Sequence, residues 1–308
     1  MGIKTVIVDG NLFEQIQYQS SSLPISLYEE YFDDFLNGEV NYHWHDEFEL
    51  GIVLQGEVEY HINQHHQEHA PRILNAGEGI FVNSKSLHMA RQAKPGSMIF
   101  DFVFPANFFS LQPSGIVYQN NILPIIQLPL PGLFLSPEND VEREILHVLR
   151  QFYELDPREL GYELQCIEII CKIWRHLLIR VSDLNDFPEI YTSVFMQEQR
   201  IRLMLSYIHT HYSENIVVDH IAGSANISRS ECFRCFKRII RKSPIEYLCE
   251  YRLSRAAQLL TNTGKNVLEI CYACGFSSPS YFGKIFKESC GMSPGQFRIQ
   301  SRNGHHID

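Results

Sequence analysis

Residues 269–282 of the 308-residue chain read EICYACGFSSPSYF. This stretch predicts two short helices that are joined by a tight turn. The first helix covers Leu268–Cys274, Gly275 begins the turn, and Ser278 caps a second helix with Pro279 at its first position. Apolar side chains at helical spacing form the buried face of this second helix, namely Phe282, Ile285 and Phe286. The stretch therefore predicts a helix-turn-helix unit.

A second copy of the pattern lies about 50 residues earlier. Ser243-Pro244 precedes Ser293-Pro294 by 50 residues, and each serine is followed three residues later by Glu246 or Gln296. Both sites predict a capping box with proline at the first helical position. An internal repeat that matches in caps and core aromatics indicates two related structural units.

The first copy predicts a helix over Val217–Ser224, a turn over 225–227 and a second helix that begins after Ser228. Glu231 completes a capping box with Ser228. The expected buried stripe of this helix consists of Cys232, Cys235, Phe236 and Ile239. A long helix from Pro244 to about Leu260 separates the two units.

Both second helices carry polar and basic side chains on their outer faces. Such side chains neutralise phosphates and contact base edges in the major groove of DNA. We expect Arg234 and Lys284 to make base contacts or close phosphate contacts. The candidate DNA-binding residues are Ser228, Arg229, Ser230, Phe233, Arg234, Lys237, Arg238, Ser278, Ser280, Tyr281, Lys284 and Lys287.

The net charge of −10 averages two segments of opposite sign. Residues 1–194 carry 11 Lys and Arg against 27 Asp and Glu, a net charge of −16. Residues 195–308 carry 15 against 9, a net charge of +6. Because basic surface is what binds phosphate, only the C-terminal segment is suited to nucleic acid.

The N-terminal half alternates apolar and polar residues after a mixed polar arm over residues 1–40. Phe48–Leu54 and Val58–Ile62 flank the two-residue turn Gln55-Gly56 and predict a hairpin. Further short strands are expected near 72–74, 79–82, 89–92 and 98–104. Many short strands with close turns predict a small sandwich or barrel.

Two amphipathic helices are expected after a proline-rich stretch. The first follows Ser136 as N-cap and Pro137 as first helical residue, and the second runs from about Leu160 to Val181. One stripe of the second helix consists of Leu164, Ile167, Cys171, Trp174 and Leu178. These helices either cover a face of the sheet or also form a dimer interface.

A polar cluster is predicted inside the β-rich module. His43, His45, Glu47 and Glu49 share parity, so a continuous strand would place them on one face. Together with His88, two of these imidazoles and a carboxylate could hold an octahedral divalent metal ion. The alternatives are an effector pocket without a required metal and a purely structural polar interior.

The residues of the C-terminal repeat resemble the signature of AraC/XylS-type transcription regulators over about residues 196–300. The resemblance rests on residues 269–282, Phe286-Lys287, Gly291, Ser293-Pro294 and Phe297-Arg298. It implies two helix-turn-helix units on a rigid linker helix that read successive major-groove segments. The first unit has Arg241 where the second has Gly291, so we expect its helix to end differently or Arg241 to bind phosphate.

The N-terminal cluster resembles the first cupin motif, His43-x-His45-x3-Glu49-x6-Gly56, and Gly77-Glu78-Gly79 with His88 loosely resembles the second. Cupins are jelly rolls whose interiors enclose ligands, and sensors of AraC-type regulators have the His-x-His pattern without being enzymes. The resemblance favours a sugar or related polar metabolite as effector, bound by His43, His45, Glu49 and His88. A metal-dependent cupin oxygenase or isomerase fused to a helical domain is the alternative.

Other classes of protein fit less well. No run reaches the roughly 18 apolar residues of a membrane helix, and the N-terminus has no signal-peptide core. The eight cysteines all lie beyond residue 165, which favours a reducing cytoplasm over a disulfide scaffold. The pairs Cys232-x-x-Cys235 and Cys271-x-x-Cys274 could suggest zinc, but we interpret them as small core residues.

We therefore predict an α+β protein that is not an enzyme. A cupin-like jelly-roll sensor occupies residues 1–130, and a helical dimerisation segment with a linker occupies 131–190. An all-α tandem helix-turn-helix domain occupies 191–302, and 303–308 form a tail. The expected partners are double-stranded promoter DNA, a small-molecule effector, a second copy of the chain and RNA polymerase. No cofactor is required by this prediction, although the cluster leaves room for a divalent metal.

Overall fold

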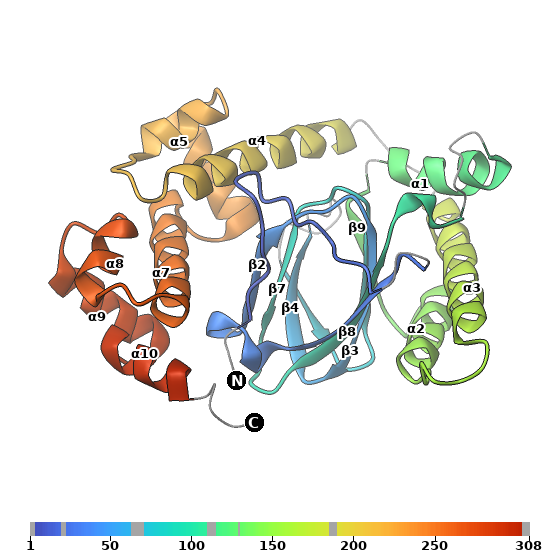
Figure 1. Cartoon of the computed structure of the whole chain (residues 1–308). Coiled ribbons are helices and arrows are strands. Elements are labelled where there is room, and N and C mark those ends of the chain that lie inside the picture. The colour runs from blue at the N-terminus through green and yellow to red at the C-terminus, as the bar shows by residue number, and fades with distance from the viewer. Residues whose placement is uncertain are drawn as a thin grey trace. The chain divides into compact units, whose positions relative to one another are not determined.

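The computed structural model describes residues 4–19, 23–62, 71–109, 115–128, 130–184 and 190–303 (Figure 1). Residues 185–189 of the predicted linker and 304–308 of the predicted tail lie outside these ranges. The chain divides into two compact units. The β unit comprises residues 14–32 and 40–196, and the helical unit comprises residues 1–13, 33–39 and 197–308.

The β unit is built on two antiparallel sheets, which confirms the predicted cupin-like jelly roll. One sheet has the order β1-β8-β3-β6-β9 and the other has the order β2-β7-β4-β5. The chain turns at Gly56 as predicted, but the predicted hairpin is wrong, because β3 and β4 belong to different sheets and this turn connects the two sheets. The strands are β1 (Ser26–Tyr31), β2 (Glu39–His43), β3 (Phe48–Gln55), β4 (Glu57–Ile62), β5 (Arg72–Asn75), β6 (Gly79–Val82), β7 (His88–Gln92), β8 (Met98–Phe104) and β9 (Gly132–Leu135).

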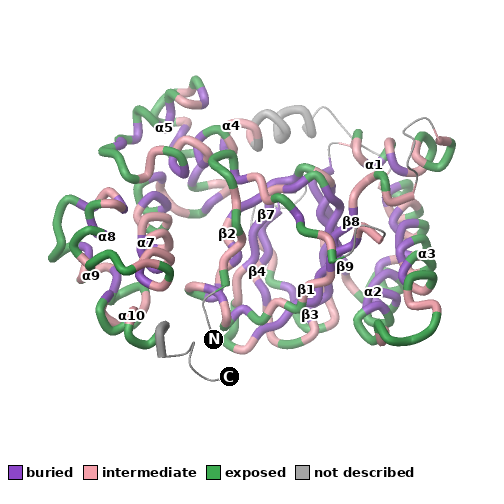
Figure 2. Tube along the Cα trace, in the orientation of Figure 1, coloured by how far each residue is buried: buried purple, intermediate pink, exposed green. Residues whose placement is uncertain are grey.

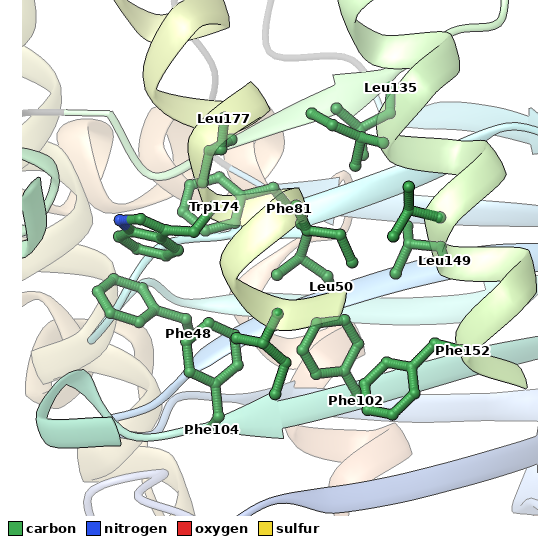
Figure 3. Packing of buried hydrophobic residues seen from close by; sticks show 14 of the residues in the cluster. Phe48, Leu50, Phe81, Phe102, Phe104, Leu135, Leu149, Phe152, Trp174 and Leu177 are labelled. Atoms are coloured by element: carbon green, nitrogen blue, oxygen red, sulfur yellow. The ribbon is translucent and has the colours of Figure 1, made fainter. Parts of the chain in front are cut away.

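Alternation along the strands of the five-stranded sheet places its aromatic side chains on one face. Phe48, Leu50 and Ile52 on β3 join Phe102 and neighbouring residues in one buried cluster (Figure 3). The helices α2 (Asp140–Tyr153) and α3 (Tyr162–Ser182) complete that cluster with residues such as Leu149, Phe152, Trp174 and Leu177. The two helices therefore cover the outer face of this sheet, and the residues of opposite parity point between the sheets.

Two details of these helices differ from the prediction. Helix α2 begins after Asn139, whose side chain accepts hydrogen bonds from the backbone of Val141 and Glu142, so Ser136 is not its N-cap. Asn139 satisfies two of the free N–H groups of the first turn, which leaves Ser136 and Pro137 in the preceding loop. In α3, the prediction of which residues form the packed stripe is also wrong in part. Leu164, Ile167 and Cys171 are exposed, and the sheet-facing residues are Cys166, Ile170, Ile173, Trp174, Leu177 and Val181.

The helical unit contains the predicted pairs of helices around a long central helix. A capping box between Ser243 and Glu246 begins α7, as predicted. Arg252 of α7 donates to the carbonyl oxygens of Tyr212 and Glu214 at 2.7 Å, which ties α7 to the chain after α4. The helices are α4 (Ile190–His211), α5 (Val218–Ser224), α6 (Arg229–Cys235), the π-helical turn η5 (Phe236–Ile240), α7 (Pro244–Asn262), α8 (Val267–Ala273), α9 (Pro279–Cys290) and α10 (Pro294–Asn303).

The described residues among the first 40 form more regular structure than the predicted polar arm. They contribute β1 and the start of β2, because Ser26–Tyr31 pairs with β8 along its whole length. Residues 9–12 pack in the helical unit, where the hydroxyl of Ser206 donates to the carbonyl of Gly10 at 2.8 Å. The remaining short helices are η1 (Phe32–Asp34), η2 (Leu36–Gly38), η3 (Ala106–Phe109), η4 (Tyr118–Ile122) and α1 (Leu123–Gln127). Within the described residues, every helix is too short or too polar to cross a membrane.

Candidate functional site

The two helix-turn-helix units are α5–α6 and α8–α9. In each unit a serine at the start of the second helix accepts a hydrogen bond from the third helical residue: Ser228 from Glu231 at 3.2 Å and Ser278 from Tyr281 at 3.3 Å. Cys232, Cys235 and Phe236 are buried as predicted, and Ile239 is half-buried. The four thiols of the Cys-x-x-Cys pairs are all buried among helices, where they pack as small apolar side chains.

The turns of the two units have matching backbones. Asn226 and Gly275, 49 residues apart, both adopt the left-handed conformation with φ of 53° and 78°. A Cβ atom at Gly275 would lie 2.6 Å from the carbonyl oxygen of Tyr212, so this turn requires glycine for space as well as for conformation. The corresponding turn of the first unit tolerates Asn226, a residue type that visits this conformation readily.

The helix ends also match, which corrects the expectation for Arg241. Arg241 has φ of 62° and Gly291 has φ of 72°, so both second helices end in a left-handed residue. The first unit therefore ends its helix in the same way as the second one and not differently. Because Arg241 has a side chain, it occupies this conformation at a cost that glycine avoids.

The outer faces of α6, η5 and α9 carry the candidate DNA-binding residues. The exposed ones are Ser228, Arg229, Ser230, Phe233, Arg234, Lys237, Ser278, Ser280, Tyr281, Lys284 and Lys287, and Arg238 is half-buried. Arg234 forms an ion pair with Glu231, and Lys284 lies 3.9 Å from Glu288. These surface ion pairs are weak, so both cations remain available to phosphate.

The polar cluster of the β unit gathers at one end of the sandwich. His43, His45, Glu49 and His88 are all buried, and one ligand atom of each lies within 4.8 Å of the others. The prediction that one continuous strand carries His43, His45 and Glu49 on one face is wrong. His43 ends β2 and Glu49 lies on β3, which belong to opposite sheets, so the chain crosses between the sheets at residues 44–47. The cluster forms because both sheets contribute to it.

Hydrogen bonds and ion-pair contacts hold the four side chains. The Nε2 atoms of His45 and His88 each lie 3.1 Å from Oε2 of Glu49, and Tyr60 donates to Oε1 of Glu49 at 2.6 Å. Nε2 of His43 lies 3.4 Å from Glu14. Glu47, which shares parity with Glu49, accepts from Tyr18 at 2.5 Å and is outside the four-residue group.

Burial and the neighbouring charged groups together set the electrostatics of the cluster. It lowers the pKa of His43 well below its ordinary value, and the neighbouring His88 and His45 act in the same direction. Burial also opposes ionisation of Glu49, but His88 and His45 outweigh it and hold the pKa of that carboxyl well below its ordinary value. Glu49 is therefore a carboxylate in the interior.

Sequence reasoning missed three members of this interior. Glu14 lies in the polar arm, where no pattern indicates it. Asp101 lies in the apolar run MIFDFVF of β8, and a lone acid in a buried strand is a signal that could have been used. Burial raises the pKa of Asp101 well above its ordinary value, with further contributions from Glu49 and Glu30. Tyr60 was assigned only to a strand, yet its hydroxyl holds Glu49.

Comparisons with known proteins agree with both halves. A family model of the AraC-like ligand binding domain matches residues 27–113, and one of a helix-turn-helix domain matches residues 221–300. An uncharacterized HTH-type transcriptional regulator of Bacillus subtilis, YdeC, is 30% identical over 295 residues, which are 95% of this chain and 97% of that protein. The chain belongs to the AraC family of transcription regulators.

Other relatives of this AraC-family regulator match it at different sequence identities and over different lengths of the chain. The melibiose operon regulatory protein of Escherichia coli K12 is 23% identical over 91% of this chain and 92% of its own. A solved AraC-type DNA-binding domain from Chromobacterium violaceum is 32% identical over 34% of this chain and 93% of its own, with a TM-score of 0.33. The domains and relatives are those of a DNA-binding regulator and not of an enzyme.

Proposed function

We propose that this AraC-family regulator binds promoter DNA through both helix-turn-helix units and is controlled by a small polar effector in the β unit. The observation that supports the proposal best is the repeated pair of helices with exposed cations on α6 and α9. The effector would bind among His43, His45, Glu49 and His88. The β unit and the helical unit are joined in one chain. Effector binding would therefore change the affinity for DNA by favouring one of two arrangements of these two units.

DNA recognition would divide between the two second helices. Side chains near the starts of α6 and α9 would enter successive segments of the major groove, with Arg234 and Lys284 at the centre of the two contacts. Ser228 and Ser278 would hold the helix starts, whose N–H groups favour nearby phosphate. Lys237, Arg238 and Lys287 would contact the backbone, and Arg229, Ser230, Phe233, Ser280 and Tyr281 would complete the two contact faces.

A sugar or a related polar metabolite is the effector class that we favour. The interior offers carboxylates, imidazoles and the hydroxyl of Tyr60, which are groups that bind hydroxyl-rich ligands. Two relatives are named for sugar operons, the melibiose regulator above and a lactose operon transcription activator of Staphylococcus xylosus, 33% identical over 43% of this chain. The jelly roll would serve as the sensor.

The helices after the jelly roll would form a homodimer. The outer face of α3 and its preceding loop exposes Leu160, Leu164, Ile167 and Cys171 at helical spacing. An apolar row of this kind is unusual on a monomer and is suited to a second copy of the same helix. The dimer would act in the cytoplasm and could recruit RNA polymerase through its DNA-bound form.

Two measurements test this function. Fluorescence anisotropy with duplexes from the region upstream of the gene would show saturable, salt-dependent binding that unrelated duplexes do not compete away. A thermal-shift screen against monosaccharides and disaccharides would show stabilisation by at least one of them. Binding that is equally strong to every duplex would contradict the proposal, as would a DNA affinity that no stabilising sugar changes.

A further inference from the structure

We propose that the effector of this regulator carries a protonated primary amine, which binds the carboxyl group of Asp101 between the two sheets. The inference rests on the proposed function and deepens it. It narrows the effector from a polar metabolite to a hydroxyl-rich molecule with one ammonium group, such as an amino sugar. Asp101 lies outside the four-residue polar cluster to which that function assigns the effector.

Asp101 is the one acid in β8, whose sequence is MIFDFVF. Its neighbours Phe100 and Phe102 belong to the cluster under α2 and α3, so Asp101 points to the opposite face, between the sheets. Only 5% of Asp101 is exposed, and its Oδ1 atom has no hydrogen-bond partner in the described part of the chain. A buried carboxyl oxygen without a partner costs free energy, which a donor on a ligand would recover.

Gly51 on β3 provides the space for this carboxyl group. It lies opposite Asp101 in the pairing of β3 with β8, and a Cβ atom there would lie 1.9 Å from Oδ1 of Asp101. Tyr28 lies opposite Asp101 on the other neighbouring strand, β1. The acid is therefore accommodated in the interior by a residue without a side chain, and it does not have to turn towards the surface.

Further hydrogen-bond acceptors lie near Asp101. Glu30 is opposite Ile99 in the pairing of β1 with β8, so its side chain shares the face of Asp101. Burial raises the pKa of Tyr60 well above its ordinary value, and the nearby Glu49 and Asp101 add to this effect. The hydroxyl of Tyr60 donates to Glu49 at 2.6 Å and still has lone pairs. An ammonium group has three N–H donors and no acceptor, so it matches such a site.

The β unit has no permanent cation of its own in this interior. Among its described residues, no buried side chain is a lysine or an arginine. Arg72 and Arg91 are half-buried, and Glu78 and Glu59 hold them at 2.8 Å. A cationic ligand would supply the charge that the interior lacks, whereas an anionic ligand would be repelled.

A proton neutralises Asp101 when no ligand is bound. Burial raises the pKa of its carboxyl group well above the ordinary value, and the neighbouring Glu49 and Glu30 act in the same direction. An ammonium group would take the place of that proton, which would leave to solvent. The bound pair would then be a carboxylate and an ammonium in a buried setting, where a charge-assisted hydrogen bond is strong.

The test is a charge series of sugars, titrated by calorimetry into the full chain at pH 7. The probes are glucosamine, galactosamine and mannosamine, their parent hexoses, their N-acetyl derivatives and the corresponding hexuronic acids. We expect at least one amino hexose to bind at least about tenfold more tightly than its parent and its N-acetyl derivative. The N-acetyl derivative keeps the nitrogen without its charge. The hexuronic acids, which are anionic, should not bind.

Asp101→Asn should remove the preference for the amine, because asparagine keeps the shape of the side chain and cannot become negative. Glu57→Gln is the matched control and should keep the preference, since Glu57 has the opposite parity to Tyr60 on β4 and lies 3.8 Å from the exposed Lys94. Glu30→Gln, at a half-buried position, should weaken binding of the amino hexose several-fold. It provides a second variant if Asp101→Asn does not fold, and DNA binding without ligand reports folding of each variant.

The outcomes separate this inference from the proposed function. The inference is overturned if no amino hexose binds, if a hexuronic acid or a parent hexose binds as tightly as the amino hexose, or if Asp101→Asn keeps the wild-type preference. If a neutral hexose binds and changes specific DNA binding, the amine assignment alone fails. If the wild-type chain shows no specific DNA binding, the proposed function fails whatever the calorimetry shows.

Discussion

Asp101 on β8 lies directly opposite Gly51 on β3, and its carboxyl group occupies the space that a side chain at residue 51 would need. A Cβ atom on Gly51 would lie 1.9 Å from Oδ1 of Asp101. Since both residues point between the sheets, the absence of a side chain at 51 allows an acidic group to face the proposed effector site.

The first prediction concerns this pair. We expect Gly51→Ala to destabilise the protein by about 1–3 kcal/mol, because the clash lies in a packed interior. Gly223→Ala is the control, since a Cβ atom there meets nothing within 4 Å and alanine favours the helix α5. Urea unfolding measures both. Equal stabilities of the two variants would show that the interior can accommodate the extra group.

The second prediction concerns DNA contact. Arg234→Ala and Lys284→Ala should each weaken binding to a specific duplex at least about tenfold. Where the lost contact is to phosphate, the slope of log affinity against log salt concentration should also fall in magnitude by about 1. The double variant should lose specific binding while its unfolding transition stays the same. Arg158→Ala, an exposed cation of the β unit, is the control. Unchanged affinity of the double variant in a gel-shift titration would refute the assignment of these two residues.

The third prediction concerns the outer face of α3. Leu164 is 72% exposed, and Leu164→Glu should convert a dimer into a monomer because it places a charge in an apolar interface. Light scattering after size exclusion should give twice the chain mass of 35.8 kDa for the wild type and the single mass for the variant. Ile7→Glu, at another exposed apolar position, should leave the dimer intact. A wild-type chain that stays monomeric at every concentration would rule this interface out.

The fourth prediction concerns pH. Burial lowers the pKa of His209 to about 3, with a further contribution from Arg255, while its ring nitrogen bonds the hydroxyl of Tyr247 at 2.8 Å. The unfolded chain binds the proton near pH 6.5, so stability is lost as the pH falls from 6.5 towards 3. Between pH 7 and pH 5 this loss amounts to about 2 kcal/mol.

His209→Gln should remove that part of the pH dependence, because glutamine keeps a polar group near Tyr247 and does not titrate. Urea midpoints at pH 7 and pH 5 measure it, and the difference between wild type and variant isolates His209 from the other titrating groups. Parallel pH profiles for the two proteins would mean that His209 is not buried in its neutral form.

The sequence predicted some elements well because their signals are local. Ser278, Pro279 and Gly275 specify a helix start and a turn within a few residues. Gly56 specifies a turn in the same way, but not that this turn connects two different sheets. The inner face of α3 is harder to predict from the sequence. Leu164 and Ile170 are both apolar, and only the tertiary packing decides which of them is buried. Asn139 replaced Ser136 as the cap of α2 because two capping residues compete within four positions.

The polar cluster shows the same limit at the level of the site. His43, His45, Glu49 and His88 were grouped correctly, but on the wrong assumption of a single strand. Their convergence depends on the chain crossing between two sheets, which spacing alone does not reveal. Glu14 comes from a segment without any periodic pattern, so its position beside His43 could be known only from the fold.

The most direct test of the central claim is selection of binding sites by the full chain from a library of random duplexes. Two helix-turn-helix units on one linker helix should enrich a site with two sequence blocks about one helical turn, roughly 10 base pairs, apart. Lys284→Ala should erase one block and Arg234→Ala the other. Enrichment of no sequence, or of one block that neither substitution changes, would contradict the account of this protein as a tandem helix-turn-helix regulator.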